Sequence, residues 1–99
     1  MKYYYVYIAQ CSDKSYYIGV TNDLNRREAE HNSEFLLCRS YTYRKRPVKI
    51  IYWEEFVDIN EAIRREKQIK RWSRKKKEAL IKKNFEKLPK LSERKILNR

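Results

Sequence analysis

The sequence predicts an α+β domain: a small three-stranded antiparallel sheet flanked by helices, in the order ββα, βα, α. Two short hydrophobic stretches near the N-terminus and one near the middle alternate as half-buried strands do. Helix-starting residues follow the second and third stretches, and occur again at Ser73. A chain of 99 residues without repeats or a linker is expected to form one domain. We place it at residues 1–83 and expect a basic, loosely ordered tail over residues 84–99.

The first two expected strands form a hairpin. Residues 3–10 alternate, with tyrosines and an alanine on one face and tyrosine, valine and isoleucine on the other. Residues 11–15 have turn composition, and residues 16–20 are expected to return as the second strand. A connection with an odd number of residues places Tyr7 and Tyr17 on the same face of this hairpin.

The first expected helix begins after the Thr-Asn-Asp run at residues 21–23, a good helix start, and ends near His31. Its Leu24, Arg27 and His31 fall at i, i+3 and i+7 and therefore share a face. Because Leu24 should point inward, Arg27 and His31 should also point toward the protein. The alternative is a surface arginine and a histidine that complements the helix C-terminus.

The second half of the chain is expected to hold one strand and two helices. A basic, poorly periodic loop over residues 33–46 precedes a strand at residues 48–56, with Ile50, Tyr52 and Glu54 on one face. Asp58 and Glu61 have the spacing of a capping box, which opens a helix over residues 59–71. Ser73 is expected to cap a further basic helix that continues through Lys83.

The charge of the chain indicates a polyanionic partner. There are 25 Lys and Arg against 13 Asp and Glu, a formal net charge of +12. Nucleic acid is the expected partner; a membrane surface is disfavoured because no long apolar helix face accompanies the charge. The sequence shows no signal peptide and no membrane-spanning run, and Cys11 and Cys38 have no metal-ligand spacing. We therefore expect a cytoplasmic protein with reduced thiols.

One carboxylate is expected to point inward from the second helix. Glu66 lies between Ile63 and Ile69 at a spacing that places it in an apolar stripe, where it needs a partner, a metal or a raised pKa. The ordinary explanation is an ion pair with Arg65 or Arg27. An inward carboxylate opposite an inward arginine also suits a one-metal phosphodiester site.

The strand tyrosines are candidates for the same site. A phenol is a poor base at neutral pH unless nearby cations lower its pKa, and Arg27, a bound cation and the net charge all act in that direction. Core packing is the alternative for Tyr7 and Tyr17. The single glycine of the chain, Gly19, follows the second strand's tyrosines. A glycine is needed there either for a positive φ or for a close approach of another group.

Together these residues resemble the GIY-YIG nuclease superfamily. The second signature triplet stands as Tyr17-Ile18-Gly19, and the first as Tyr5-Val6-Tyr7, with Tyr5 in place of the usual glycine. The stretch from Gly19 to Arg27, followed by His31, matches the pattern after the second triplet, and the segment 62–70 around Glu66 resembles the metal-ligand helix. The resemblance covers roughly residues 3–83 and is closest to small stand-alone members.

The resemblance implies a GIY-YIG-like nuclease domain with five catalytic residues and one divalent ion. By position, Tyr7 and Tyr17 match the signature tyrosines, one of which is thought to activate water, and Arg27 matches the essential arginine. His31 matches a position that assists proton transfer or contacts substrate. Glu66 matches the single ligand of one Mg²⁺ or Mn²⁺ ion.

Basic residues in two places are expected to grip the nucleic acid through its phosphates. One group lies in the expected loop and the other around the turn between the last two helices: Arg39, Arg44, Lys45 and Arg46, and Lys70, Arg71, Arg74 and Lys75. Tyrosines interleaved with the loop cations are suited to stacking on unpaired bases or to packing on the domain.

The sequence thus favours a metal-dependent endonuclease that hydrolyses phosphodiester bonds in DNA, structure-selective or weakly sequence-specific, with a tyrosine-activated water. The alternative is a non-catalytic DNA- or RNA-binding protein on the same fold. DNA is favoured over RNA, although charge alone does not separate them. Larger members of the superfamily gain specificity from an attached DNA-binding domain, so we expect a protein partner to supply specificity here.

Overall fold

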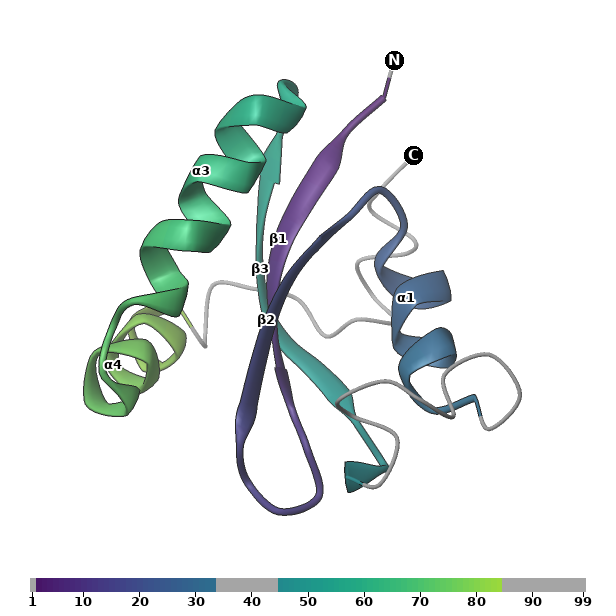
Figure 1. Ribbon diagram of the computed structural model, residues 1–99, viewed down its shortest axis with the longest axis vertical. Coiled ribbons are helices and arrows are strands. Elements are labelled where there is room, and N and C mark those ends of the chain that lie inside the picture. Colours follow the sequence, from purple (N-terminus) through teal and green to yellow (C-terminus); the bar gives the residue numbers. More distant parts are fainter. Residues whose placement is uncertain (1, 34–44, 85–99) are drawn as a thin grey trace.

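The computed structural model describes residues 2–33 and 45–84 and has the predicted α+β fold, a three-stranded antiparallel sheet in the order β2-β1-β3 with three helices. Figure 1 shows α1 on one face of the sheet and α3 and α4 on the other. The elements are β1 (Tyr4–Gln10), β2 (Tyr16–Thr21), α1 (Leu24–His31), β3 (Lys49–Phe56), α3 (Ile59–Lys70) and α4 (Arg74–Asn84). The expected tail beyond Asn84 and Cys38 lie outside the described residues.

The central strand β1 supplies both hydrophobic cores, because its side chains alternate between the two faces of the sheet. Tyr5, Tyr7 and Ala9 lie in the core beneath α1, while Val6 and Ile8 lie in the core beneath α3. The register pairs Tyr7 with Gly19 and Ala9 with Tyr17, so the two signature tyrosines occupy the same face, as predicted. Within the described residues no helix is long and apolar enough to cross a membrane.

The predicted alternation of β3 is wrong at its start. The pairing of β3 with β1 shifts between Ile8 and Ala9, which pair with Tyr52 and Ile50, so one residue of β3 is extra at this point. This β-bulge reverses the alternation. Ile50 consequently joins the core beneath α1, whereas Tyr52, expected on the same face, lies in the core beneath α3.

Polar side chains attach α1 to the first residues of β3. The Asn32 amide donates from Nδ2 to Val48 O at 2.9 Å and accepts from Val48 N at 2.7 Å. The Glu28 carboxylate accepts from Ile50 N at 2.8 Å, next to the bulge. Asn32 Nδ2 also donates to Glu28 O, so the same amide pairs with a backbone carbonyl in the last turn of α1. These bonds fix the face of α1 that carries Arg27 and His31.

The start of each helix is capped where the sequence predicts it. Asp23 accepts from Arg26 N, Ser73 from Lys76 N, and the Asp58 carboxylate accepts from Asn60 N, the second residue of α3. In a capping box the Asp58 side chain would accept from the backbone N–H of the third residue, Glu61. Here it accepts from the second residue instead.

The apolar stripe of α3 differs from the predicted one by one residue. Ala62 and Ile69 are fully buried against the sheet, whereas Ile63 is 37% exposed. Both Ala62 and Ile63 are apolar, and the smaller residue allows α3 to lie closer to the sheet. Glu66 remains on the inward side because it lies four residues after Ala62.

The attachment of α1 can be tested at Asn32. Replacing it with alanine leaves the backbone N–H and C=O of buried Val48 without their side-chain partners. We expect Asn32→Ala to lower the free energy of unfolding by about 1–3 kcal/mol, measured by urea denaturation. Asn22→Ala, which removes an exposed asparagine bonded to Arg26, is the matched control and should change stability by less than about 0.5 kcal/mol. Equal effects of the two substitutions would contradict this attachment.

Candidate active site

The phenol of Tyr7 is the centre of the candidate site. Its side chain is fully buried on β1, with no exposed surface. The Tyr7 hydroxyl lies 2.8 Å from Nε2 of His31, and Arg27 Nε donates to the same oxygen at 3.2 Å. The predicted inward face of α1 is therefore confirmed: Arg27 and His31 both contact the strand tyrosine.

Gly19 is required by the ring of Tyr7. The backbone φ of Gly19 is not positive, so the first of the two reasons for a glycine does not apply. The ring lies directly over this residue: an added Cβ would stand 2.6 Å from the Tyr7 hydroxyl oxygen and 2.7 Å from the ring carbon that carries it. The close approach of Tyr7 to the neighbouring strand is therefore possible only across a glycine.

Tyr17 and His31 complete an aromatic cluster with Tyr7. The ring centroids of Tyr17 and His31 are 4.9 Å apart in an edge-on arrangement, and those of Tyr7 and Tyr17 are 6.3 Å apart. Tyr17 is half-buried, unlike Tyr7. Of the two tyrosines, Tyr17 is thus the one that reaches the protein surface.

Arg27 acts to lower the pKa of Tyr7, as predicted, but burial of the phenol has the larger effect. Burial raises the pKa of Tyr7 to about 12, although the hydrogen bond from Arg27 and its positive charge act to lower it. The loss of hydration therefore outweighs the neighbouring guanidinium. At neutral pH Tyr7 is a phenol that can donate one hydrogen bond while it accepts another.

His31 is neutral at physiological pH. Burial and the positive charge of Arg27 lower the pKa of its imidazole to about 4, against a smaller effect of Glu30. Arg27 can only donate, so the Tyr7 oxygen accepts from it and the Tyr7 proton is available to His31 Nε2. This assignment places the imidazole proton on Nδ1 and makes Nε2 the acceptor.

Glu30 holds Arg27 in position, a role that the sequence reasoning missed. Arg27 Nη1 donates to Glu30 Oε1 at 3.1 Å, and both side chains are 29% exposed. The signal was present, since a carboxylate three residues after an arginine lies on the same side of a helix. One nitrogen of the guanidinium thus contacts Tyr7 and another contacts Glu30.

Glu66 pairs with neither of the partners proposed for it. Its carboxylate, 18% exposed, lies 2.9 Å from Lys70 Nζ, one turn along α3. Arg65 instead pairs with Glu54 at 2.8 Å, and Arg27 pairs with Glu30. The negative charge of Glu66 makes the smallest contribution to the elevation of the Tyr7 pKa.

The donor set around Glu66 fits Mg²⁺ better than a transition metal. No group of three or more His, Cys, Asp or Glu side chains gathers for a metal within residues 2–33 and 45–84. Mg²⁺ is commonly held by one or two carboxylates, with water and substrate phosphate as the remaining ligands. A lone carboxylate beside a substrate site satisfies that requirement, and Zn²⁺ would need more protein ligands.

The expected nucleic-acid residues have varied surroundings. Lys45 pairs with Asp13 at 3.4 Å, and Arg46 contacts the backbone oxygen of Asn32. Arg74 stacks on the ring of Tyr16 and pairs with Glu78. Lys70 is the partner of Glu66, whereas Arg71 and Lys75 are exposed. Arg39 and Arg44 lie outside the described residues.

A second polar cluster joins β3 to α3 and was not predicted. Glu54 accepts from Arg65 through both carboxylate oxygens and from the hydroxyl of Tyr52. Arg65 also lies 5.1 Å over the ring of Trp72. Burial raises the pKa of Tyr52, and the Glu54 carboxylate adds to that effect. This cluster neutralises Arg65 and fixes the end of α3.

Comparisons with known proteins identify the chain's relatives. The model of the GIY-YIG catalytic domain matches residues 3–79. A UPF0213 protein of Listeria monocytogenes is 46% identical over 78 residues, which cover 79% of this chain and 85% of the relative. A UPF0213 protein of Halobacterium salinarum is also 46% identical, over 79% of this chain and 99% of the relative. The solution NMR structure of a Bacillus halodurans UPF0213 protein has a TM-score of 0.52 and 38% identity, covering 81% of this chain and 83% of that chain.

Contact between Gly19 and Tyr7 can be measured by a double-mutant cycle. Gly19→Ala puts a methyl group where the Tyr7 ring lies, so we expect a loss of about 1–3 kcal/mol in the free energy of unfolding. In a Tyr7→Leu background the ring is absent, and the same glycine substitution should cost less than about 0.5 kcal/mol. An equal cost in both backgrounds would mean that Gly19 acts on the strand and not on the ring.

The buried histidine predicts a pH dependence of stability. Unfolded His31 binds a proton below about pH 6.5, whereas the folded protein holds its pKa at about 4. Between these values the unfolded chain binds more protons, so the free energy of unfolding falls as the pH is lowered from about 6.5 to 4. The loss due to His31 is on the order of 2–3 kcal/mol at the lower end.

Urea denaturation at several pH values checks this expectation against His31→Gln. Glutamine can accept from Tyr7 but does not titrate, and the chain has one histidine. The difference between the two pH profiles therefore isolates His31, because the carboxylates titrate in both proteins. Identical profiles would show that the histidine is not buried in its neutral form.

Proposed function

The chain belongs to the GIY-YIG family, and we propose that it is a metal-dependent endonuclease that hydrolyses phosphodiester bonds in DNA. The observation that carries the proposal is the arrangement around Tyr7. A buried phenol, a neutral imidazole and a guanidinium meet at one oxygen, with a second tyrosine in ring contact. A hydrophobic core requires no such polar groups, and their burial costs free energy that their mutual hydrogen bonds offset only in part.

The difference in burial assigns different roles to the two tyrosines. Tyr7 has no exposed surface and a raised pKa, so we assign it to holding Arg27 and His31 in place. Tyr17 is half-buried and is assigned to the attacking water, which must come from solvent. The edge-on contact of Tyr17 with the ring of His31 holds the Tyr17 ring in a fixed orientation.

Arg27 is assigned to the charge that develops on the phosphate. Its guanidinium is 29% exposed, and its contacts with Tyr7 and Glu30 hold it without covering every donor. A fixed cation at a partly dry site stabilises a phosphorane-like charge more strongly than it would in water. Glu66 would hold the one Mg²⁺ or Mn²⁺ ion, which supplies further stabilisation of charge on the phosphate and the leaving oxygen.

The alternative function is nucleic-acid binding on the same fold without cleavage. Glu66 argues against it, since a carboxylate near the binding surface repels phosphate unless a cation lies between them. The Lys70 ammonium offsets part of that repulsion in the absence of a divalent ion. The two functions therefore differ in how binding responds to Mg²⁺, which strengthens binding only where Glu66 holds the ion.

Cleavage of labelled DNA in the presence and absence of Mg²⁺ tests the proposal. Single-stranded, duplex and branched substrates of the same sequence, with matched RNA, are incubated with the wild-type protein and with Glu66→Gln. We expect Glu66→Gln to lose at least about a hundredfold in cleavage rate while it keeps its affinity for substrate. Equal activity of both proteins would indicate a contaminating nuclease. Binding without cleavage by either protein would favour the alternative.

The same assay separates the two tyrosines under single-turnover conditions. Tyr17→Phe should retain the wild-type stability and lose about a hundredfold or more in rate, as expected when the group that activates water is removed. Tyr7→Phe should lose stability as well as rate, because Arg27 and His31 both lose their bonds to the phenol oxygen. Small and equal effects on the rate would exclude a phenol as the group that activates water.

A further inference from the structure

The outward side of α3 carries an open groove. The groove has a volume of about 700 Å³ and is lined by Glu61, Arg64, Arg65, Lys67, Gln68, Arg71 and Trp72. Such a volume is in the range of cavities that hold drug-sized ligands, which is comparable to one or two nucleotide units and far smaller than a duplex. Glu66 precedes the groove residue Lys67 in the sequence but lies on the inward side of α3, about 100° around the helix axis from Lys67.

Three cations in this groove have no acidic partner among the described residues. Arg64, Lys67 and Arg71 are exposed and form no ion pair there, whereas Arg65 is paired with Glu54. Their spacing at i, i+3 and i+7 puts them in one row, roughly 10 Å long along the helix axis. Three unpaired positive charges in a row favour a ligand with regularly spaced negative charges.

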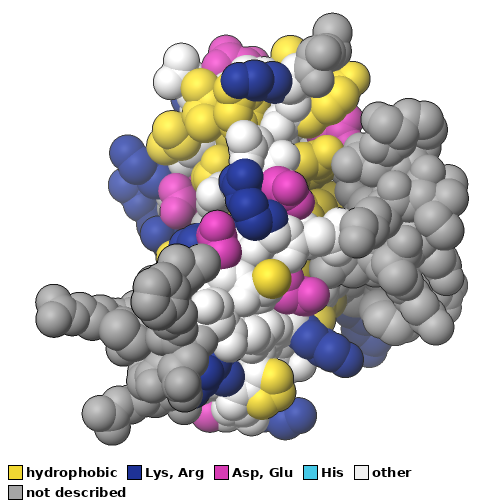
Figure 2. All heavy atoms as spheres, turned by 90° about the vertical axis from the view of Figure 1, so that its right-hand side faces the viewer, with side chains coloured by type: hydrophobic (Ala, Val, Ile, Leu, Met, Phe, Trp, Pro, Cys, Tyr) yellow, Lys and Arg dark blue, Asp and Glu magenta, His cyan; other side chains and the backbone are white. Residues whose placement is uncertain are grey.

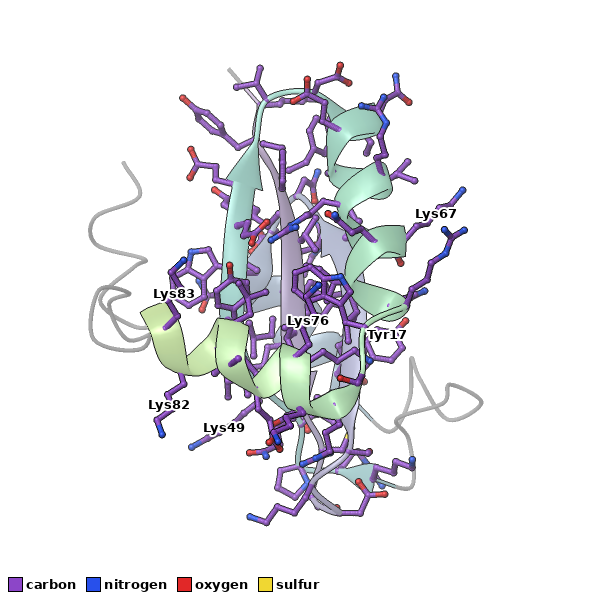
Figure 3. The ribbon with its side chains drawn as sticks, turned by 90° about the vertical axis from the view of Figure 1, so that its left-hand side faces the viewer. Tyr17, Lys49, Lys67, Lys76, Lys82 and Lys83 are labelled. Atoms are coloured by element: carbon purple, nitrogen blue, oxygen red, sulfur yellow. The ribbon has the colours of Figure 1, made fainter. Side chains whose placement is uncertain are left out.

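Among the residues that the structure describes, Figure 2 shows no comparable row on the face that carries α1. Figure 2, which looks onto that side, shows Lys and Arg interspersed with Asp and Glu among the described side chains. On the opposite side, Figure 3 shows Lys67 and Tyr17 toward the same edge of the molecule, and Lys49, Lys82 and Lys83 toward the other edge. Lys67, which lines the groove, therefore lies toward the same edge as Tyr17 in this view.

Trp72 gives the groove a flat apolar surface at one end. Its ring is half-buried against the core beneath α3, and Lys76 Nζ lies 4.4 Å over it. An exposed lysine is readily displaced, and a base stacked in its place would keep the ring covered. The freed ammonium of Lys76 would then be available to a neighbouring phosphate.

We propose that this groove binds a single strand of nucleic acid on its way to or from the Tyr17 side of the site, with phosphates on Arg64, Lys67 and Arg71 and an unpaired base on Trp72. The proposal rests on the proposed nuclease function and specifies its substrate as one that offers an unpaired strand. An acidic peptide would satisfy the cations but would offer no base to stack on the Trp72 ring. The Glu61 carboxylate limits the path at the other end of the groove, since it repels phosphate.

Binding of fluorescently labelled single-stranded DNA tests the proposal in a Glu66→Gln background without divalent ions, so that no cleavage is required. The triple variant Arg64→Gln, Lys67→Gln, Arg71→Gln is compared with a matched control, Lys49→Gln, Lys82→Gln, Lys83→Gln. Both variants lose three charges from exposed, unpaired positions. We expect the groove variant to lose about tenfold or more in affinity, with a salt slope smaller by about 2, and the control less than about threefold.

Two further measurements distinguish a strand-binding groove from general charge attraction. Trp72→Leu, which keeps an apolar side chain against the core, should weaken single-strand binding by about fivefold or more. A duplex of the same sequence should bind more weakly than the single strand. Circular dichroism confirms that each variant is folded.

Several results would overturn the proposal. These are equal losses for the two triple variants, tighter binding of the duplex than of the single strand, an unchanged affinity in Trp72→Leu, or equal competition by polyglutamate. Each of these results is a binding measurement and does not depend on cleavage. If the protein fails to cleave any substrate but the groove variant loses affinity as expected, the nuclease function fails and the strand-binding groove stands.

Discussion

A single buried oxygen organises the candidate site. The Tyr7 hydroxyl accepts from Arg27 and lies against His31, and these two residues come from a helix that has no backbone hydrogen bonds to the sheet. The phenol ring reaches them only because it crosses a glycine on the next strand. Three elements, β1, β2 and α1, therefore meet at one atom. A change in any of them moves the functional groups together, which is how a small domain keeps a polar site rigid.

The burial of this site has opposite effects on its two titratable rings. The pKa of Tyr7 rises and that of His31 falls, and in both cases the neutral form is favoured because hydration is lost. Arg27 keeps its charge and is the one permanent cation at the phenol. The result is a cluster with a fixed positive charge and two neutral hydrogen-bonding rings, a combination that suits an anionic substrate. The carboxylate of Glu66 belongs to α3, on the opposite face of the sheet from α1, and pairs there with Lys70.

The sequence predicted the elements of the fold and the inward face of α1, because strand and helix periodicities alone place Tyr7, Tyr17, Arg27 and His31. It could not predict the bulge at Ile50, since the isoleucine and aromatic residues there have no feature that marks an extra residue. Nor could it choose between Ala62 and Ile63 for the core, because the rotation of α3 depends on how closely the helix packs. The partners of Glu66 and Arg65 were missed for a similar reason: several oppositely charged neighbours were within reach, and tertiary packing selects among them.

The bulge in β3 also limits how the length of this strand can change. Ile50 and Trp53 face the core beneath α1, and Tyr52 faces the core beneath α3. Ile51, the extra residue of the bulge, stands between Ile50 and Tyr52. Loss of Ile51 would leave Ile50, Tyr52 and Trp53 in plain alternation, each still facing its present core. Loss of a residue elsewhere in the strand would shift the residues between the deletion and the bulge by one position. Their side chains would then face the opposite side of the sheet. In homologous chains, a one-residue deletion in this strand is therefore compatible with the fold within the Ile50-Ile51 pair, where loss of either isoleucine leaves the same sequence.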